Sequence, residues 1–100
     1  MCDGPGCRPG EQTPRVGAYA CCIGRYIYVC GGLSGGHVLK SVERFDTETN
    51  QWELVAPMRR ARSLAAGAVI DGRIYIAGGR GNGTLCLHGV EYYTPSTDTW

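Results

Sequence analysis

Six cysteines and two histidines are the residues of this sequence best suited to metal binding or nucleophilic catalysis. The histidines are His37 and His88, and the cysteines are Cys2, Cys7, Cys21, Cys22, Cys30 and Cys86. Their spacing contains neither paired Cys-x-x-Cys motifs nor a Cys/His pattern typical of zinc sites. No Ser, His and Asp residues are spaced like a nucleophilic triad. We therefore expect no metal, no cofactor and no enzymatic activity, and we interpret the cysteines as reduced thiols.

Three short motifs suggest other chemistry, and each also has a simpler structural interpretation. "RRAR" at 59–62, followed by Ser63, has the composition of a basic cleavage or phosphorylation site, and we favour a structural or surface role. Asn82-Gly83-Thr84 fits the N-glycosylation pattern, and we favour a turn. "GGRGNG" lacks the Gly-Lys-Ser/Thr and the helix of a phosphate-binding loop, so nucleotide binding is not expected.

The overall composition excludes several kinds of partner. The chain has 100 residues, a formal net charge of +1 and a pI of about 7.6, so no general attraction to nucleic acid or to an anionic membrane is expected. Its longest apolar run falls far short of the ~20 residues that a membrane span needs. Residues 1–14 are rich in Gly and Pro and lack the pattern of a secretory signal, which predicts a disordered leader on a cytoplasmic protein.

An internal repeat runs through most of the chain. "IYVCGG" at 27–32 and "IYIAGG" at 74–79 are nearly identical and lie 47 positions apart, as do Arg15 and Arg62. After the glycine pairs the spacing becomes 48, as between Trp52 and Trp100. One residue is therefore inserted between the glycine pair and the Val-Glu pair of the second copy. Because length variation is typical of loops, that segment is predicted to be a loop.

Each copy has the pattern of short strands separated by turns. Apolar or alternating runs of strand length, many of them rich in β-branched and aromatic residues, occur at 18–23, 26–30, 41–46, 52–58, 64–70, 74–77 and 89–94. "GR", "DGR", "TETNQ" and "PSTDT" have the composition of the turns between them. No apolar period of 3.6 residues persists along the chain, so no helix is expected. The sequence therefore predicts an all-β fold of antiparallel strands.

The combined motif resembles the kelch repeat. It consists of an arginine, a strand that ends in Gly-Gly, a Val-Glu-x-aromatic segment, a Trp and then Pro-Met, and its copies fall in phase within residues 15–100. The wording "SVERFD…NQWELVAPM" is typical of the kelch-like proteins. The resemblance implies four-stranded blades of a partial β-propeller, with one complete blade at 15–61 and a second at 62–100 that lacks its last strand. Because propellers close with roughly four to eight blades, we interpret the chain as a fragment of a ring.

The resemblance also implies structural roles for the repeated residues. Gly31-Gly32 and Gly78-Gly79 would let the backbone turn tightly and approach a neighbouring segment. Trp52 and Trp100 would fill the layer between blades. Glu43 and Glu91 would pair with Arg62 or another arginine across the contact between blades, the alternative being solvated charges on the strands. Arg15 is the counterpart of Arg62 in the first copy.

The function implied by the resemblance is protein binding. In kelch-like adaptors, loops at one rim of the ring bind a substrate protein that a cullin-type ubiquitin ligase modifies. The corresponding loops here are 33–40 and 80–89, and we expect their contact residues to be Ser34, His37, Arg80, Asn82 and Thr84. The position two residues after the arginine, which carries a polar contact residue in some adaptors, is Gly17 or Leu64, and this departure argues against acidic-peptide specificity. Cullin binding would require a separate BTB region, which this sequence does not contain.

Two other functions are compatible with the same repeat. The first is a cytoskeletal role, in which a kelch protein binds actin. The second and more remote one is a kelch-fold copper oxidase, which needs a cluster of Tyr, His and Cys ligands that is not recognisable here. Two blades made alone would leave apolar faces and a strand edge uncovered, so we expect such a chain to be poorly stable or to associate.

Overall fold

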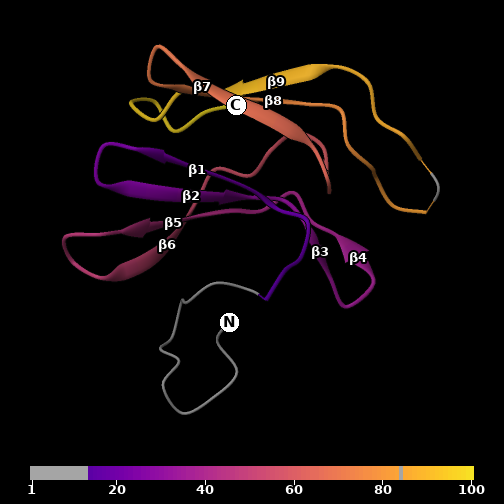
Figure 1. Cartoon of the computed structure of the whole chain (residues 1–100), viewed down its shortest axis with the longest axis horizontal. Coiled ribbons are helices and arrows are strands. Elements are labelled where there is room, and N and C mark those ends of the chain that lie inside the picture. Colours follow the sequence, from indigo (N-terminus) through magenta and orange to yellow (C-terminus); the bar gives the residue numbers. More distant parts are fainter. Residues whose placement is uncertain (1–13, 84) are drawn as a thin grey trace.

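The protein is built from β-strands over the residues that the structure describes, 14–83 and 85–100. The computed structural model (Figure 1) has nine strands: β1 Tyr19–Ile23, β2 Tyr26–Cys30, β3 Leu33–Ser34, β4 His37–Val38, β5 Val42–Asp46, β6 Gln51–Val55, β7 Ala66–Ile70, β8 Arg73–Ala77 and β9 Val90–Tyr93. No helix occurs in this part of the chain, and so none there is suited to crossing a membrane. The all-β prediction is therefore confirmed.

The longer strands form two antiparallel sheets that lie face to face (Figure 1). The first sheet, blade 1, has the strand order β1-β2-β5-β6, and the second, blade 2, has the order β7-β8-β9. In blade 1 the register places Phe45 opposite Trp52, and in blade 2 it places Ile74 opposite Tyr93. Two stacked antiparallel sheets connected in this order confirm the predicted partial β-propeller.

The connections within each sheet depend on residues that tolerate left-handed backbone. Asp71 and Gly72, with φ of 51° and 73°, form the two-residue turn between β7 and β8, as "DG" predicts. Between β5 and β6, Asp46 Oδ1 accepts hydrogen bonds from the backbone N–H groups of Glu48 and Thr49. These turns fix which residues face each other across the strands.

Segment 33–40, which the sequence analysis treated as a flexible loop, contains a small hairpin. Strands β3 and β4 pair Leu33 with Val38 and Ser34 with His37. Gly35 and Gly36 form its turn with φ of 56° and 83°, the backbone geometry that suits the twist of a two-residue hairpin. The Gly-Gly pair within residues 33–38 was a sufficient signal for this hairpin, which we did not predict.

The hydrophobic core lies between the two blades. Its buried residues come from both sheets and from the segment that links them, and they are Tyr28, Cys30, Val42, Met58, Ile74, Ile76 and Tyr93. The rings of Tyr28 and Tyr93, one from each blade, have centroids 5.7 Å apart. Gly67 of β7 packs so closely on Tyr19 that a Cβ there would come within 2.7 Å of the ring. Contact between the blades is therefore tight where β1 and β7 meet.

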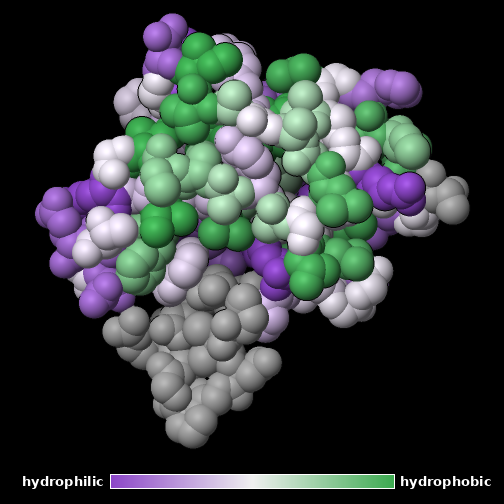
Figure 2. All heavy atoms as spheres, in the orientation of Figure 1, coloured by the Kyte–Doolittle hydropathy of each residue, from purple (hydrophilic) through white to green (hydrophobic). Residues whose placement is uncertain are grey.

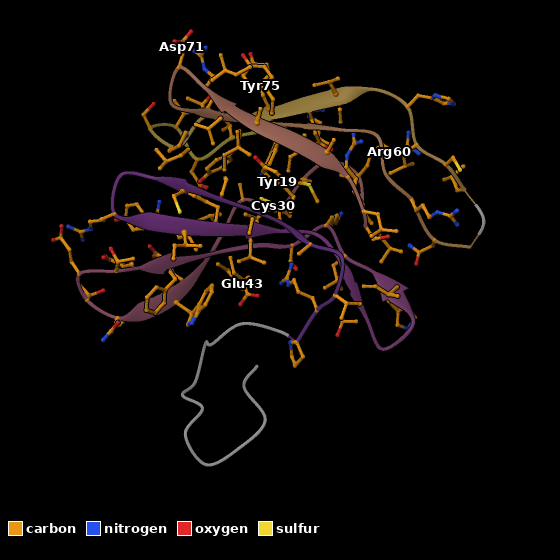
Figure 3. All side chains as sticks on the ribbon, in the orientation of Figure 1. Tyr19, Cys30, Glu43, Arg60, Asp71 and Tyr75 are labelled. Carbon is orange, nitrogen blue, oxygen red and sulfur yellow. The ribbon has the colours of Figure 1, made fainter. Side chains whose placement is uncertain are left out.

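The strands also present two faces that point away from the core. Figure 3 shows Cys30 and Tyr19 pointing between the sheets, Tyr75 pointing away from blade 1, and Glu43 pointing away from blade 2. The outer face of blade 2 carries the stacked rings of Tyr75 and Tyr92, whose centroids are 5.2 Å apart. By the alternation of side chains along a strand, these are the faces on which further blades would pack.

The connecting segments gather at two opposite edges of the sheets (Figure 1). We call one the loop edge: it contains residues 14–18, the β3–β4 hairpin, the later part of the link at 59–65 and the loop at 80–89. We call the other the turn edge: it contains the turns near residues 24, 48, 71 and 97. Residues that are distant in the sequence therefore lie together at each edge.

Candidate protein-binding edge

A buried ion pair holds the start of blade 1 to its third strand. Arg15 Nη2 donates to Glu43 Oε1 over 2.6 Å, and both side chains are only 2% exposed. Arg15 Nη1 also donates to the carbonyls of Gly31 and Ser41 at 2.8 and 2.9 Å. One guanidinium thus connects three backbone segments at the base of the loop edge.

The same arrangement recurs in blade 2. Arg62 Nε donates to Glu91 Oε2 over 3.1 Å, and Arg62 Nη1 donates to the carbonyl of Gly78 over 2.8 Å. Glu91 additionally accepts the backbone N–H groups of Arg59 and Arg60 at 2.7 and 3.3 Å. Each glutamate therefore pairs with the arginine that opens its own repeat, and Arg62 pairs with Glu91 rather than with Glu43. Both glutamates thus pair with an arginine, as expected, but each does so within its own repeat rather than across the contact between the blades, and the alternative of solvated charges was wrong.

The glycine pairs lie where backbone segments come close together. Gly31 has φ of 68°, and a Cβ on it would collide with the carbonyl of Arg62 at the start of blade 2. Gly32 N–H donates to that same carbonyl over 2.8 Å. In blade 2, a Cβ on Gly79 would come within 2.6 Å of the Ser63 carbonyl, whereas Gly78 has more room and φ of 67°. The glycines thus allow the loop edge to be closely packed.

The two tryptophans have different surroundings. Trp100 Nε1 donates to the Ala56 carbonyl at the end of blade 1 over 2.7 Å, and its ring lies 5.1 Å from that of Tyr93. Trp100 therefore lies between the blades. Trp52 packs at a tilt against Phe45, with ring centroids 5.1 Å apart, on the face of blade 1 that points away from blade 2. Trp52 is thus placed to pack against a further blade on that face, as Trp100 packs against blade 1.

Asp98 contributes to the contact between blades, a role that we did not predict from the sequence. Its Oδ1 accepts the Tyr93 hydroxyl over 2.7 Å and the Ala56 N–H over 2.9 Å. The bond from Tyr93 is the main reason why the pKa of Asp98 is lowered, and the bond from Ala56 adds to it. Asp98 has φ of 51°, like its counterpart Asn50 with φ of 61°. An Asn or Asp two residues before each Trp was the available signal.

The predicted contact residues lie on the loop edge, and a hydrogen bond connects the two loops that carry them. Ser34 and His37 pair with each other in the β3–β4 hairpin, where His37 is exposed and Ser34 half-buried. Arg80 and Asn82 are exposed on the neighbouring loop, and Asn82 Oδ1 accepts the Val38 N–H over 3.0 Å. Thr84 falls outside the described residues. The hairpin of blade 1 and the loop of blade 2 therefore form one continuous surface.

Accessibility separates the residues of the basic motif at 59–63. Arg59 and Arg60 are exposed, whereas Arg62 and Ser63 are buried. Ser63 also exchanges two backbone hydrogen bonds with Arg80, at 2.8 and 2.9 Å. A protease or kinase cannot reach Arg62 or Ser63 unless this edge opens, which supports the structural interpretation of the motif.

The cysteines do not combine into a reactive centre in the described part of the chain. Cys21, Cys22, Cys30 and Cys86 are free thiols, and Cys2 and Cys7 fall outside the described residues. Burial raises the pKa of Cys21 to about 11 and also raises that of Cys30, so both are protonated near neutral pH. Residues 14–83 and 85–100 contain no group of three His, Cys, Asp or Glu side chains placed to hold a metal ion.

Comparison with known proteins identifies the repeat. The kelch motif matches residues 14–59 and 61–100. The chain belongs to the kelch-repeat family. The two sheets are thus kelch blades, and the paired arginines, glutamates and glycines described above are repeat residues of those blades. Membership of this family indicates a protein-interaction module.

Several kelch proteins are similar to this chain over most of its length. An F-box/kelch-repeat protein of Arabidopsis thaliana is 38% identical over 93 residues, which cover 90% of this chain and 20% of that protein. Human kelch-like protein 33 is 38% identical over 95 residues, which cover 92% of this chain and 17% of that protein. A kelch repeat and BTB domain-containing protein of Caenorhabditis elegans is 38% identical over 74 residues, which cover 74% of this chain and 13% of that protein. The chain thus spans a fifth or less of the length of these curated relatives.

Proposed function

We propose that these kelch blades belong to a propeller that binds a substrate protein at its loop edge and presents it to a cullin-type ubiquitin ligase. The observation that carries the binding proposal is the 3.0 Å hydrogen bond from Val38 N–H to Asn82 Oδ1. It joins the exposed loops of two neighbouring blades into one surface. This surface includes Ser34, His37, Arg80 and Asn82.

The base beneath this surface is rigid, which favours recognition without a large loss of entropy. Arg15 and Arg62 each bind a glutamate and a glycine carbonyl directly below the loops. Rigid elements that display polar loops are a recurrent design of protein-binding scaffolds. The exposed side chains of His37 and Arg80 are free to turn toward a bound segment and donate hydrogen bonds to it.

The ligase part of the proposal is supported by the kinds of domain named in similar proteins. Relatives of this chain carry names that include an F-box or a BTB domain together with kelch repeats. In the kelch-like adaptors that this sequence resembles, the BTB region contacts the cullin and the propeller contacts the substrate. We assign the cullin contact to such a region outside these 100 residues, and the cytoplasm as the place where the adaptor acts.

The proposal is tested by purifying the complete protein that carries these blades from cells and identifying what accompanies it. The double variant His37→Ala/Arg80→Ala removes two exposed side chains of the loop edge, and we expect its substrate recovery to fall by about tenfold or more. Its cullin recovery should stay unchanged, because the cullin contact lies elsewhere. The control variant Glu48→Ala/Ser96→Ala alters the exposed turn edge and should retain both partners.

Other results would overturn defined parts of the proposal. If the unaltered protein brings down no cullin, the ligase assignment is wrong, and recovery of actin in its place would support the cytoskeletal function. If the substrate survives the loop-edge variant but not the turn-edge variant, then the binding surface has been assigned to the wrong edge.

A further inference from the structure

The exposed apolar residues of this protein fall into two groups. One group lies on the faces of strands β6, β7 and β9, where a neighbouring blade has room to pack. The other group lies on the loop edge and consists of Val16, Leu33, Leu64 and Leu85. Ring closure by further blades covers faces and leaves the edges open. The second group therefore needs a different explanation from the first.

Leu64 is the least expected member of this group. Its side chain is 69% exposed, and its backbone has φ of 56°, a left-handed conformation that disfavours any residue with a Cβ. At the equivalent position of the first repeat, Gly17 has φ of 70°. The backbone geometry thus suits glycine in both blades, yet one blade carries an exposed leucine. Strain of this kind at an accessible position is typical of functional sites.

The backbone segments that carry Val16 and Leu33 run beside the one that carries Leu64. Val16 and Leu33 exchange backbone hydrogen bonds at 3.0 and 2.7 Å, and their side chains are 66% and 38% exposed. Leu64 N–H donates to the carbonyl of Gly17, the residue that follows Val16, over 2.9 Å. We call these three side chains the apolar rim cluster. Figure 2 shows hydrophobic atoms on the surface at this end of the molecule, over the β3–β4 hairpin.

The charges around the apolar rim cluster have one sign. The exposed charged residues described on the loop edge are Arg59, Arg60 and Arg80, and Lys40 follows the β3–β4 hairpin; all four are basic. Glu43 and Glu91, the acidic residues that bind arginines of this edge, are buried on strands β5 and β9. Exposed Glu48 and Asp71 lie at the opposite, turn edge. A segment bound at the loop edge would thus be repelled if basic residues flanked its contact side chain.

We infer that the apolar rim cluster anchors one large aliphatic or aromatic side chain of the bound protein segment, and that this segment has no basic residues beside that side chain. Leu64 is the specificity-determining residue of the site. This inference rests on the proposed function, because it names the kind of segment that the loop edge selects. It differs from a purely polar recognition surface built from Ser34, His37, Arg80 and Asn82.

The test uses the complete protein, immobilised, and a display library of random twelve-residue peptides as the probe. Enriched peptides should share one large apolar residue with neutral or acidic neighbours. Two variants then separate binding from folding. Leu64→Gly removes the side chain and relieves the backbone strain, and Leu64→Asn replaces it with a polar residue that tolerates left-handed backbone. Both should weaken binding of the enriched peptides by about tenfold, and Leu64→Gly should leave the melting temperature unchanged or raise it.

The outcomes distinguish this inference from the proposed function. Peptides that lose affinity with Leu64→Gly but not with the turn-edge control Ser96→Ala support it. Peptides of polar consensus that are lost with Arg80→Ala and are indifferent to both Leu64 variants overturn the inference and leave the proposed function intact. Enriched peptides that bind equally well to all loop-edge variants overturn both.

Discussion

Arg62 Nε lies 3.1 Å from Glu91 Oε2 in a buried ion pair, and the same carboxylate accepts the N–H groups of the link that precedes the arginine. The pair thus connects the link between the blades to the third strand of the blade that follows. Because Arg15 and Glu43 form the corresponding pair in blade 1, the interaction is a property of the repeat.

Removing one partner of this ion pair should be strongly destabilising. Glu91→Ala leaves Arg62 buried without its counter-charge and deprives Arg59 N–H of its acceptor, so we expect a loss of about 3–5 kcal/mol in the free energy of unfolding. Urea denaturation of the complete protein measures the loss. The matched control is Arg25→Ala, which breaks the exposed contacts with Asp46 and Glu48 and should cost at most about 1 kcal/mol. Equal losses from the two variants would contradict this assignment.

Substituting the first glycine of a pair should be costly because of both backbone conformation and space. Gly31→Ala faces a left-handed φ and a collision with the Arg62 carbonyl, and we expect a loss of roughly 2–5 kcal/mol. Gly24 has a similar φ, but a Cβ there meets nothing within 4 Å, so Gly24→Ala should cost only about 1 kcal/mol. Because both glycines have a left-handed φ, the difference between the two melting temperatures measures the cost of the steric collision at Gly31. If the two variants melt together, the backbone has shifted to make room.

Asp98 should stabilise the contact between blades through its two hydrogen bonds. Asp98→Ala leaves Ala56 N–H and the Tyr93 hydroxyl without their acceptor, and we expect a loss of about 1–3 kcal/mol. Asp98→Asn keeps an acceptor and tolerates the positive φ, so its loss should be smaller. Thermal unfolding of both variants checks this order, and equal losses would show that charge rather than hydrogen bonding matters at this position.

The same residue predicts a pH dependence. Because the folded-state pKa of Asp98 is lowered, mainly by the hydrogen bond from Tyr93, its contribution is present above the unfolded-state pKa of about 3.9 and is lost as the pH falls through the folded value. The difference in stability between the unaltered protein and Asp98→Asn should therefore shrink on acidification. An NMR titration of Tyr93→Phe should show the Asp98 pKa rising toward its usual value. An unchanged pKa in that variant would rule out the hydroxyl as the cause.

The 100-residue chain produced alone should associate with itself. Tyr92 on the outer face of blade 2 and Leu54 on the outer face of blade 1 are both exposed. Because the blades are copies of one repeat, the outer face of blade 2 matches the core-facing side of blade 1, and the outer face of blade 1 matches the core-facing side of blade 2. Tyr92→Glu and Leu54→Glu should each reduce large assemblies, and a mixture of the two should form a dimer through the unaltered faces. Sedimentation velocity measures this, and a monomeric unaltered chain at micromolar concentration would contradict it.

Much of the secondary structure of this protein is predictable from its sequence because short local patterns of residues specify the strands and turns. Alternating apolar residues, the Asp-Gly turn and the doubled glycines act over a few positions, and they correctly predicted the longer strands. The stacking of two blades, and the place of Ser34, His37, Arg80 and Asn82 at one edge, were implied by the resemblance to the kelch repeat. Even the hairpin at 33–38, which we missed, follows from a local Gly-Gly turn.

Tertiary structure alone decided which residues meet across long stretches of chain. Arg15 and Arg62 were both available to either glutamate, and only the folding of each blade assigned Arg62 to Glu91 and Arg15 to Glu43. The hydrogen bonds of Asp98 and Trp100 to Ala56 likewise join positions more than forty residues apart. Composition and spacing describe each strand separately, whereas these contacts depend on how distant segments are placed within a folded blade and between the two blades. The side chains that meet at the loop edge, Leu64 among them, are therefore visible only in the assembled blades.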